Sequence, residues 1–177
     1  MKNSFLRYID TCYQIAPTGL YVGLLVLFCL GSVLLLVLMD TPKGVKWSMR
    51  LLLFEYLFWI LSIAVFFRAT MNQRMESLAP FESYRAIIEG EEILPETLLN
   101  VAVFIPIGLL LGCAFGRLKW WEVLAIGGCF SLLIEMLQFL LKRGFAEFDD
   151  VFHNLLGCAI GFLGYLALTH VVKRVSK

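Results

Sequence analysis

The chain has 177 residues, of which 60% are hydrophobic and 16% are charged, with a formal net charge of +1 and a mean hydropathy of +0.82. An ordinary soluble domain carries about 25% charged residues, so this composition excludes that class and indicates a membrane protein. The balanced charge gives no support for a nucleic-acid partner. The five cysteines show no CxxC spacing, so we expect neither a zinc site nor a disulfide framework, and no cofactor is predicted.

The first 19 residues are predicted to form an amphipathic helix that lies on the membrane surface. Apolar residues recur at helical spacing from Phe5 to Cys12, and Pro17 and Gly19 end the pattern. A frayed tail is the alternative interpretation. No apolar segment typical of a secretory signal follows Lys2.

Five apolar runs of about 20 residues follow, the length that a bilayer core requires. They are Leu20–Met39, Trp47–Phe67, Thr97–Phe115, Trp121–Leu141 and Val151–Val172. A soluble protein with buried helices would need polar faces that these runs lack. We therefore predict an all-α polytopic membrane bundle with about five transmembrane helices, in which residues 1–177 form a single membrane domain. Glu55 lies inside the second run, either as a buried acid or at headgroup level.

A polar segment, residues 68–96, separates the second and third runs. It carries six acids against three basic residues, and Pro80 and Pro95 bracket a stretch that is predicted to form a short interfacial helix. We expect this segment and the first two helices to cover a three-helix core, residues 97–172, that contains a polar site.

The orientation in the membrane is only weakly encoded. Lys and Arg near the helix ends number eight on one side and seven on the other, so the positive-inside rule does not decide between them. The tail VVKRVSK has three positive residues and no acid, which favours a cytoplasmic carboxyl terminus. The 68–96 segment and the turn at 142–150 would then face outward.

Polar side chains in the last two runs are the strongest functional signal. Glu135 and Gln138 lie near the end of one apolar helix, and Asp149, Asp150 and Asn154 lie at the start of the next. An ionisable side chain at the centre of a bilayer costs about 2.5–3.5 kcal/mol on insertion scales. We expect a chain that keeps several such groups close together to use them.

Loop parity brings a further polar group to the same membrane face. Asn100 lies near the start of the third helix, and alternate loops of a membrane bundle share a side. Pro106 has no N–H to donate to the carbonyl of Ala102, so we expect a kink near Asn100 and a free carbonyl that faces the carboxylates. The predicted binding site comprises Asn100, Glu135, Gln138, Arg143, Asp149, Asp150 and Asn154.

Two residues near the turn between the last two helices, Arg143 and His153, each have two possible roles. The planar guanidinium of Arg143 is suited to hold a carboxylate of residues 147–150, and a solvated turn is the other interpretation. His153 is interpreted as an interfacial histidine. Its neighbours Asp149 and Asp150 keep a divalent-cation site as a minority alternative, although no metal is predicted.

Glycines recur at helical spacing in the last three helices. Gly108 and Gly112 lie four residues apart, as do Gly157 and Gly161. Small residues at this spacing let membrane helices approach closely. We therefore predict that helices three to five pack through glycines and frame the polar site.

At these residues the chain resembles a known family. The segments LLNVAVFIPIGLLLG (98–112) and IEMLQFLLKRGFAEFDDVFHNLLGCAIG (134–161) resemble the VanZ-like family of bacterial membrane proteins, and LAPFESYR (78–85) is similar to an element of the loop that precedes them. The resemblance covers roughly residues 20–172, and Glu147 departs from it because aspartate is commoner there. The positions that match individually are Asn100, Pro106, Gly108, Glu135, Gln138, Arg143, Asp150, Asn154, Gly157 and Gly161.

The resemblance implies a multi-pass protein of the bacterial cytoplasmic membrane. The family's namesake confers low-level resistance to the glycopeptide antibiotic teicoplanin without altering the peptidoglycan target residues. The first hypothesis is accordingly a non-enzymatic envelope protein, whose polar site binds a membrane lipid, a lipophilic glycopeptide antibiotic or a lipid-linked precursor.

The second hypothesis is an intramembrane enzyme that acts on a phospholipid headgroup or a polyprenyl-phosphate carrier. Glu135 would act as general base beside Asp150, and Arg143 would stabilise a phosphate. The sequence has no Ser–His–Asp order, no HExxH and no nucleotide-binding loop, so it names no reaction, and we favour the first hypothesis. The sequence leaves the oligomeric state open.

Overall fold

The computed structural model describes residues 18–38, 41–77, 79–81, 84–85, 88 and 94–175. Residues 1–17 of the predicted surface helix lie outside the described residues. Most of the stretch between Pro80 and Pro95, where a short interfacial helix is predicted, also lies outside them.

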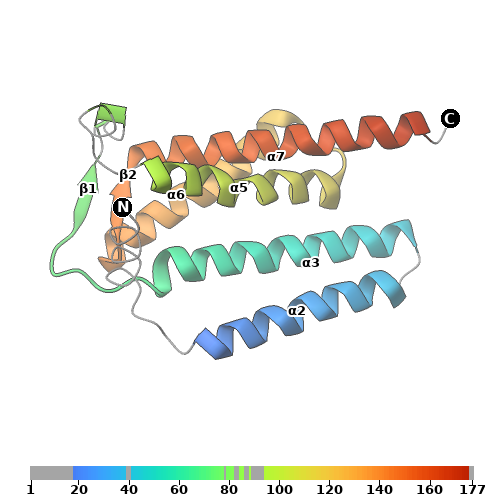
Figure 1. The fold of residues 1–177 in the computed structure, drawn as a ribbon, viewed down its shortest axis with the longest axis horizontal. Helices are drawn as coiled ribbons and strands as arrows, with labels where there is room; N and C mark the ends of the chain where they lie inside the picture. The colour runs from blue at the N-terminus through green and yellow to red at the C-terminus, as the bar shows by residue number, and fades with distance from the viewer. Residues whose placement is uncertain are drawn as a thin grey trace.

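Long helices make up most of the described chain (Figure 1). Within the described ranges, four segments are long and apolar enough to cross a membrane, namely Pro42–Phe66, Thr97–Phe115, Trp120–Leu141 and Phe148–Val175. The predicted all-α membrane bundle with about five spanning helices is confirmed. The helices are α2 (Thr18–Leu38), α3 (Pro42–Leu61) with a π-helical extension η1 (Ser62–Phe66), α5 (Leu94–Phe115), α6 (Trp120–Leu141) and α7 (Phe148–Val175).

The second helix begins five residues before the predicted Trp47. Thr41 has an extended backbone, and its side-chain oxygen accepts a hydrogen bond of 3.1 Å from the N–H of Gly44. Pro42 occupies the first turn, where a missing N–H costs nothing. This cap extends the helix beyond its apolar run, which hydropathy alone does not reveal.

The parallel helices α5 and α7 are in contact along their backbones. A Cβ atom at Gly108 would overlap the backbone carbonyl of Cys158, and one at Gly161 would overlap the carbonyl of Ile105. Gly157 is equally close to the α5 backbone. The contact fixes the starts of α5 and α7 at the same end of the bundle, as Figure 1 shows.

Helix α6 runs antiparallel to this pair and covers it. Gly127 and Gly128 of α6 face Cys158 and Leu155 of α7. Gly112 of α5 faces the aromatic ring of Tyr165 on α7 rather than backbone. Around these contacts the core is filled by Phe104, Ile107, Leu111, Val123, Ile134, Cys158 and Phe162.

Two short strands, β1 (Met75–Ser77) and β2 (Phe145–Glu147), pair in parallel with Met75 opposite Phe145. Strands of three residues show no periodic pattern, so the sequence does not predict them. The pairing ties the polar segment after α3 to the turn between α6 and α7. Both therefore lie at the end of the bundle where α5 and α7 begin (Figure 1).

The close approach of α5 and α7 predicts the effect of single methyl groups. Gly161→Ala should destabilise the protein by about 1–3 kcal/mol, because the added Cβ forces the helices apart. Gly31→Ala is the matched control, since no atom lies within 4 Å of its Cβ position, and better helix propensity should leave its stability unchanged or slightly higher. Thermal unfolding in one detergent measures both variants. Equal melting temperatures would contradict the packing role of Gly161.

Candidate functional site

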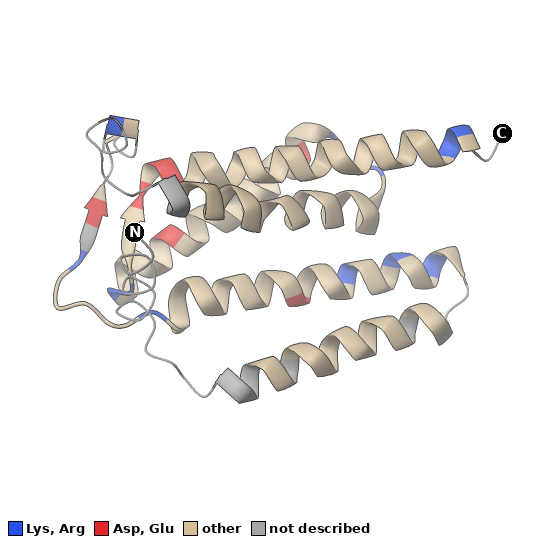
Figure 2. Cartoon of the chain, in the orientation of Figure 1, with Lys and Arg blue, Asp and Glu red and all other residues tan. Residues whose placement is uncertain are grey.

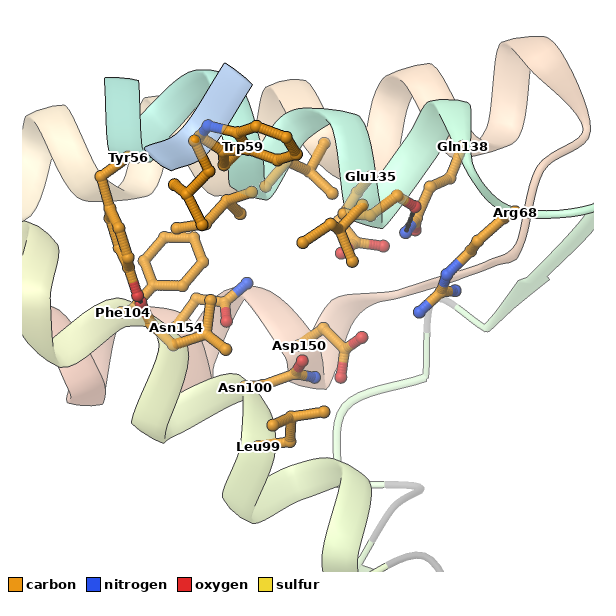
Figure 3. Close-up of a pocket in the computed structure, with 16 residues that line it drawn as sticks. Tyr56, Trp59, Arg68, Leu99, Asn100, Phe104, Glu135, Gln138, Asp150 and Asn154 are labelled. Atoms are coloured by element: carbon orange, nitrogen blue, oxygen red, sulfur yellow. Dashed lines mark hydrogen bonds between the residues drawn. The ribbon is translucent and has the colours of Figure 1, made fainter. Parts of the chain in front are cut away.

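A cavity of about 330 Å³ lies between the helices at the end where α5 and α7 begin (Figure 3). Side chains from α2, α3, α5, α6 and α7 line it. Its apolar wall includes Leu25, Trp59, Ile60, Ile63, Leu99, Val103, Phe104 and Ile134. Its polar groups are Arg68, Asn100, Glu135, Gln138, Asp150 and Asn154.

Five of the seven predicted site residues thus line one cavity. Asp150 and Asn154 lie one turn apart on α7, and Glu135 and Gln138 lie three residues apart on α6. Residues at these spacings share a helix face. Asn100 joins them because the glycine contact sets the first turns of α5 beside those of α7.

Single hydrogen bonds fix the orientation of three of these side chains. Gln138 Nε2 donates to the carbonyl of Ala64 at 3.0 Å, and Asn154 Nδ2 donates to Ser131 Oγ at 2.8 Å. Glu135 Oε2 accepts from the backbone N–H of Glu147 at 3.0 Å. The cavity is therefore formed by positioned groups rather than by mobile surface side chains.

The polar end of the cavity is rich in hydrogen-bond acceptors. Gln138 Oε1 and Asn154 Oδ1 have no hydrogen-bond partner, and these side chains are only 3% and 4% exposed. Glu135 and Asp150 add two carboxyl groups. Buried acceptors without a partner are costly, so a bound molecule that brings donors would gain by satisfying them.

Arg68 is a cavity residue that is absent from the site predicted from the sequence. It lies two residues after the end of η1 and between Gln138 and Asp150 in Figure 3. Gly144 leaves room for it, because a Cβ at Gly144 would come within 2.6 Å of Arg68 Nη1. An arginine just after an apolar helix is typical of a snorkelling residue. Loop parity could have found Arg68, since the second helix ends on the face where the third begins.

Arg143 lies beside the cavity and does not line it. Its guanidinium donates to the backbone carbonyl of Phe66, and Gln138 donates to that of Ala64. Carbonyls in the last turn of a helix lack intrahelical donors, so these two side chains cap the end of η1. Arg143 therefore positions the chain that carries Arg68. The sequence left open a carboxylate partner or a solvated turn for its guanidinium, and the structure shows a bond to a backbone carbonyl.

Asp149 and His153 lie on a neighbouring face of α7 and hold the 68–96 segment. Asp149 Oδ1 accepts from the N–H of Phe81 at 2.7 Å, and the Tyr84 hydroxyl lies 3.0 Å from His153 Nε2. Asp149 thus anchors the segment beside the cavity instead of lining it. Within the described ranges, no three His, Cys, Asp or Glu side chains gather as a metal site.

Helix α5 remains helical on both sides of Pro106. Tyr56 of α3 donates its hydroxyl to the carbonyl of Val103 at 3.0 Å. This carbonyl follows that of Ala102, which Pro106 leaves without its usual donor. Tyr56 therefore ties α3 to α5 one residue after the interruption, on the cavity wall that Tyr56 and Val103 share.

Comparisons with known proteins agree with the resemblance described above. The VanZ/LLP1 family profile matches residues 20–170. Protein VanZ of Enterococcus faecium is 32% identical over 117 residues, which is 64% of this chain and 62% of that protein. The match therefore spans less than two thirds of the relative's length. No solved structure gives a significant match.

The bond between Asp149 and the Phe81 amide can be tested alone. A hydrogen bond to a charged group contributes about 1.5–3 kcal/mol, so Asp149→Ala should speed hydrogen exchange at Phe81 about tenfold or more. Asp149→Asn keeps an acceptor oxygen in place and should change the rate much less. Hydrogen exchange followed by mass spectrometry measures both variants, and equal rates in wild type and Asp149→Ala would refute the anchor.

Proposed function

The chain belongs to the VanZ-like family, and we propose that it is a multi-pass protein of the bacterial cytoplasmic membrane that binds the headgroup of an amphiphilic envelope molecule. The observation that carries this proposal is that one cavity has a polar end and an otherwise apolar wall. An amphiphile has the same division. Its headgroup would occupy the polar end, and the start of its chain would lie against the apolar side chains of α2, α3 and α5.

The chemistry of the polar end favours a headgroup that carries hydrogen-bond donors. Ammonium or hydroxyl groups would pair with Glu135 or Asp150 and supply donors to the unpartnered oxygens of Gln138 and Asn154. Arg68 would hold a phosphate or carboxylate of the same molecule through its planar guanidinium. A membrane lipid and a lipid-linked cell-wall precursor both have such headgroups.

Binding of this kind offers a route to altered antibiotic susceptibility. A protein that holds envelope amphiphiles in the outer leaflet would change how a lipophilic glycopeptide of the teicoplanin type accumulates there. Support comes from membership of a family whose namesake is associated with teicoplanin resistance and from the likeness to Protein VanZ of Enterococcus faecium.

An outward-facing cavity is part of the proposal. Figure 2 shows acidic residues gathered at the cavity end of the bundle, whereas the other end is mainly basic. The described basic residues of that other end are Lys43, Lys46, Arg50, Arg117, Lys119, Lys173 and Arg174. The positive-inside rule counts Lys and Arg alone and does not separate the two ends. The proposed orientation therefore rests on the carboxyl-terminal tail, which is basic and has no acid.

Removal of the two cavity carboxylates tests headgroup binding. Glu135→Gln and Asp150→Asn keep the shape of each side chain, and each should lower the retention of co-purified lipid about tenfold, the effect of losing one charged hydrogen bond. The same variants should abolish any rise in teicoplanin resistance that the wild type confers. Lipid mass spectrometry and susceptibility assays at matched protein level provide the measurements. Glu76→Gln, an exposed acid on β1, is the control.

The outcomes separate the two hypotheses. Loss of lipid retention in both cavity variants, with the lipids chemically unchanged by the wild type, supports the binding function. A new lipid species that depends on Glu135 would show instead an intramembrane enzyme with Glu135 and Asp150 as its catalytic candidates. Unaltered lipid retention and unaltered protection in both variants would overturn the proposal.

Single cysteines on a cysteine-free background test the orientation. Glu76→Cys lies on β1 at the cavity end, and Arg117→Cys lies in the short connection at the opposite end. A membrane-impermeant thiol reagent added to intact cells should label position 76 and leave 117 unlabelled until the membrane is opened. The reverse pattern would place the cavity on the cytoplasmic side.

A further inference from the structure

A second cavity, of about 240 Å³, lies against α2 and α3. Its lining combines one carboxylate with four aromatic side chains, Phe28, Phe54, Phe58 and Trp59. The carboxylate is Glu55, in the middle of the membrane span Pro42–Phe66. The headgroup cavity does not include Glu55, although Trp59 lines both cavities.

Glu55 is buried without any hydrogen-bond partner. Its side chain is 3% exposed, and neither carboxyl oxygen accepts a hydrogen bond. An isolated ionised carboxylate in an apolar medium is strongly disfavoured unless a positive charge or a proton neutralises it. The cavity beside Glu55 provides the space for a positive group.

The aromatic lining favours an organic cation over a metal ion. Faces of aromatic rings attract ammonium groups, most strongly where water is absent. Hard metal cations need several oxygen ligands, and among the described lining residues Glu55 alone provides side-chain oxygens. A quaternary ammonium group has no N–H to satisfy, so this cavity suits it better than it suits a primary amine.

We propose that this cavity binds a lipophilic quaternary ammonium cation, with Glu55 as the counter-charge and the aromatic rings around the alkyl groups. The ligand reaches it from the bilayer, because Phe54 and Phe58 are 67% and 51% exposed on the outer surface of the helices. The site is distinct from the headgroup cavity, with which it shares Trp59 and whose polar end calls for a ligand with hydrogen-bond donors.

Titration calorimetry of the purified protein in lipid nanodiscs, with benzyltriethylammonium as probe, tests this site. Glu55→Gln should weaken binding by at least about tenfold, and Phe58→Leu by about threefold to tenfold, because each removes one attraction of the cation. Phe66→Leu is the matched control, since Phe66 is an exposed aromatic residue of the same span that does not line the cavity. It should bind the probe like the wild type.

A second experiment uses only the wild-type protein. It compares the affinity of the charged probe with that of an uncharged isostere in which carbon replaces the nitrogen. The charged probe should bind at least about tenfold more tightly than the isostere, because only the charge pairs with Glu55 and attracts the rings. Equal affinity for the two compounds, no binding of the charged probe, or unchanged binding in a folded Glu55→Gln would each overturn the proposal. The wild-type comparison decides the question even where Glu55→Gln fails to fold. Glu55→Gln should still retain co-purified lipid in the headgroup cavity. This measurement separates a failure of the cation site from a failure of the proposed function.

Discussion

The rest of the structure depends on the backbone contact between α5 and α7. Carbonyl groups of one helix lie where only glycine leaves room on the other, at Gly108, Gly157 and Gly161. Because apolar side chains gain little in a bilayer by leaving lipid for protein, such close van der Waals approach is a main source of helix association there. The contact also sets the register of the pair, and the register brings Asn100 beside the first turns of α7.

The cavity depends in turn on the hydrogen bonds that cap the end of α3 and its extension η1. A helix that stops inside a membrane protein leaves carbonyls without donors, and here Gln138 and Arg143 supply them to Ala64 and Phe66. The two side chains come from the end of α6 and from the turn after it, so the cap joins α3 to the three-helix core. It also directs Arg68 into the cavity.

The polar groups divide into those that build the site and those that stay open to a ligand. Asp149 holds the segment after α3 through the Phe81 amide, and Arg143 holds the end of η1. Gln138 and Asn154 line the cavity, and each uses an amide N–H for structure and leaves a buried oxygen without a hydrogen-bond partner. Side chains that look alike in the sequence as membrane-embedded polar residues therefore have different roles.

The sequence by itself determined the membrane class, the approximate helix ends and the grouping of the polar side chains at one end of the bundle, because hydropathy, helical spacing and loop parity are properties of the chain order. It did not reveal the paired strands, the cavity role of Arg68 or the separate roles of Asp149 and Arg143. Those depend on which backbone amide or carbonyl comes within about 3 Å of each side chain. Only the tertiary structure decides such distances, because they join residues that are up to 77 positions apart in the sequence.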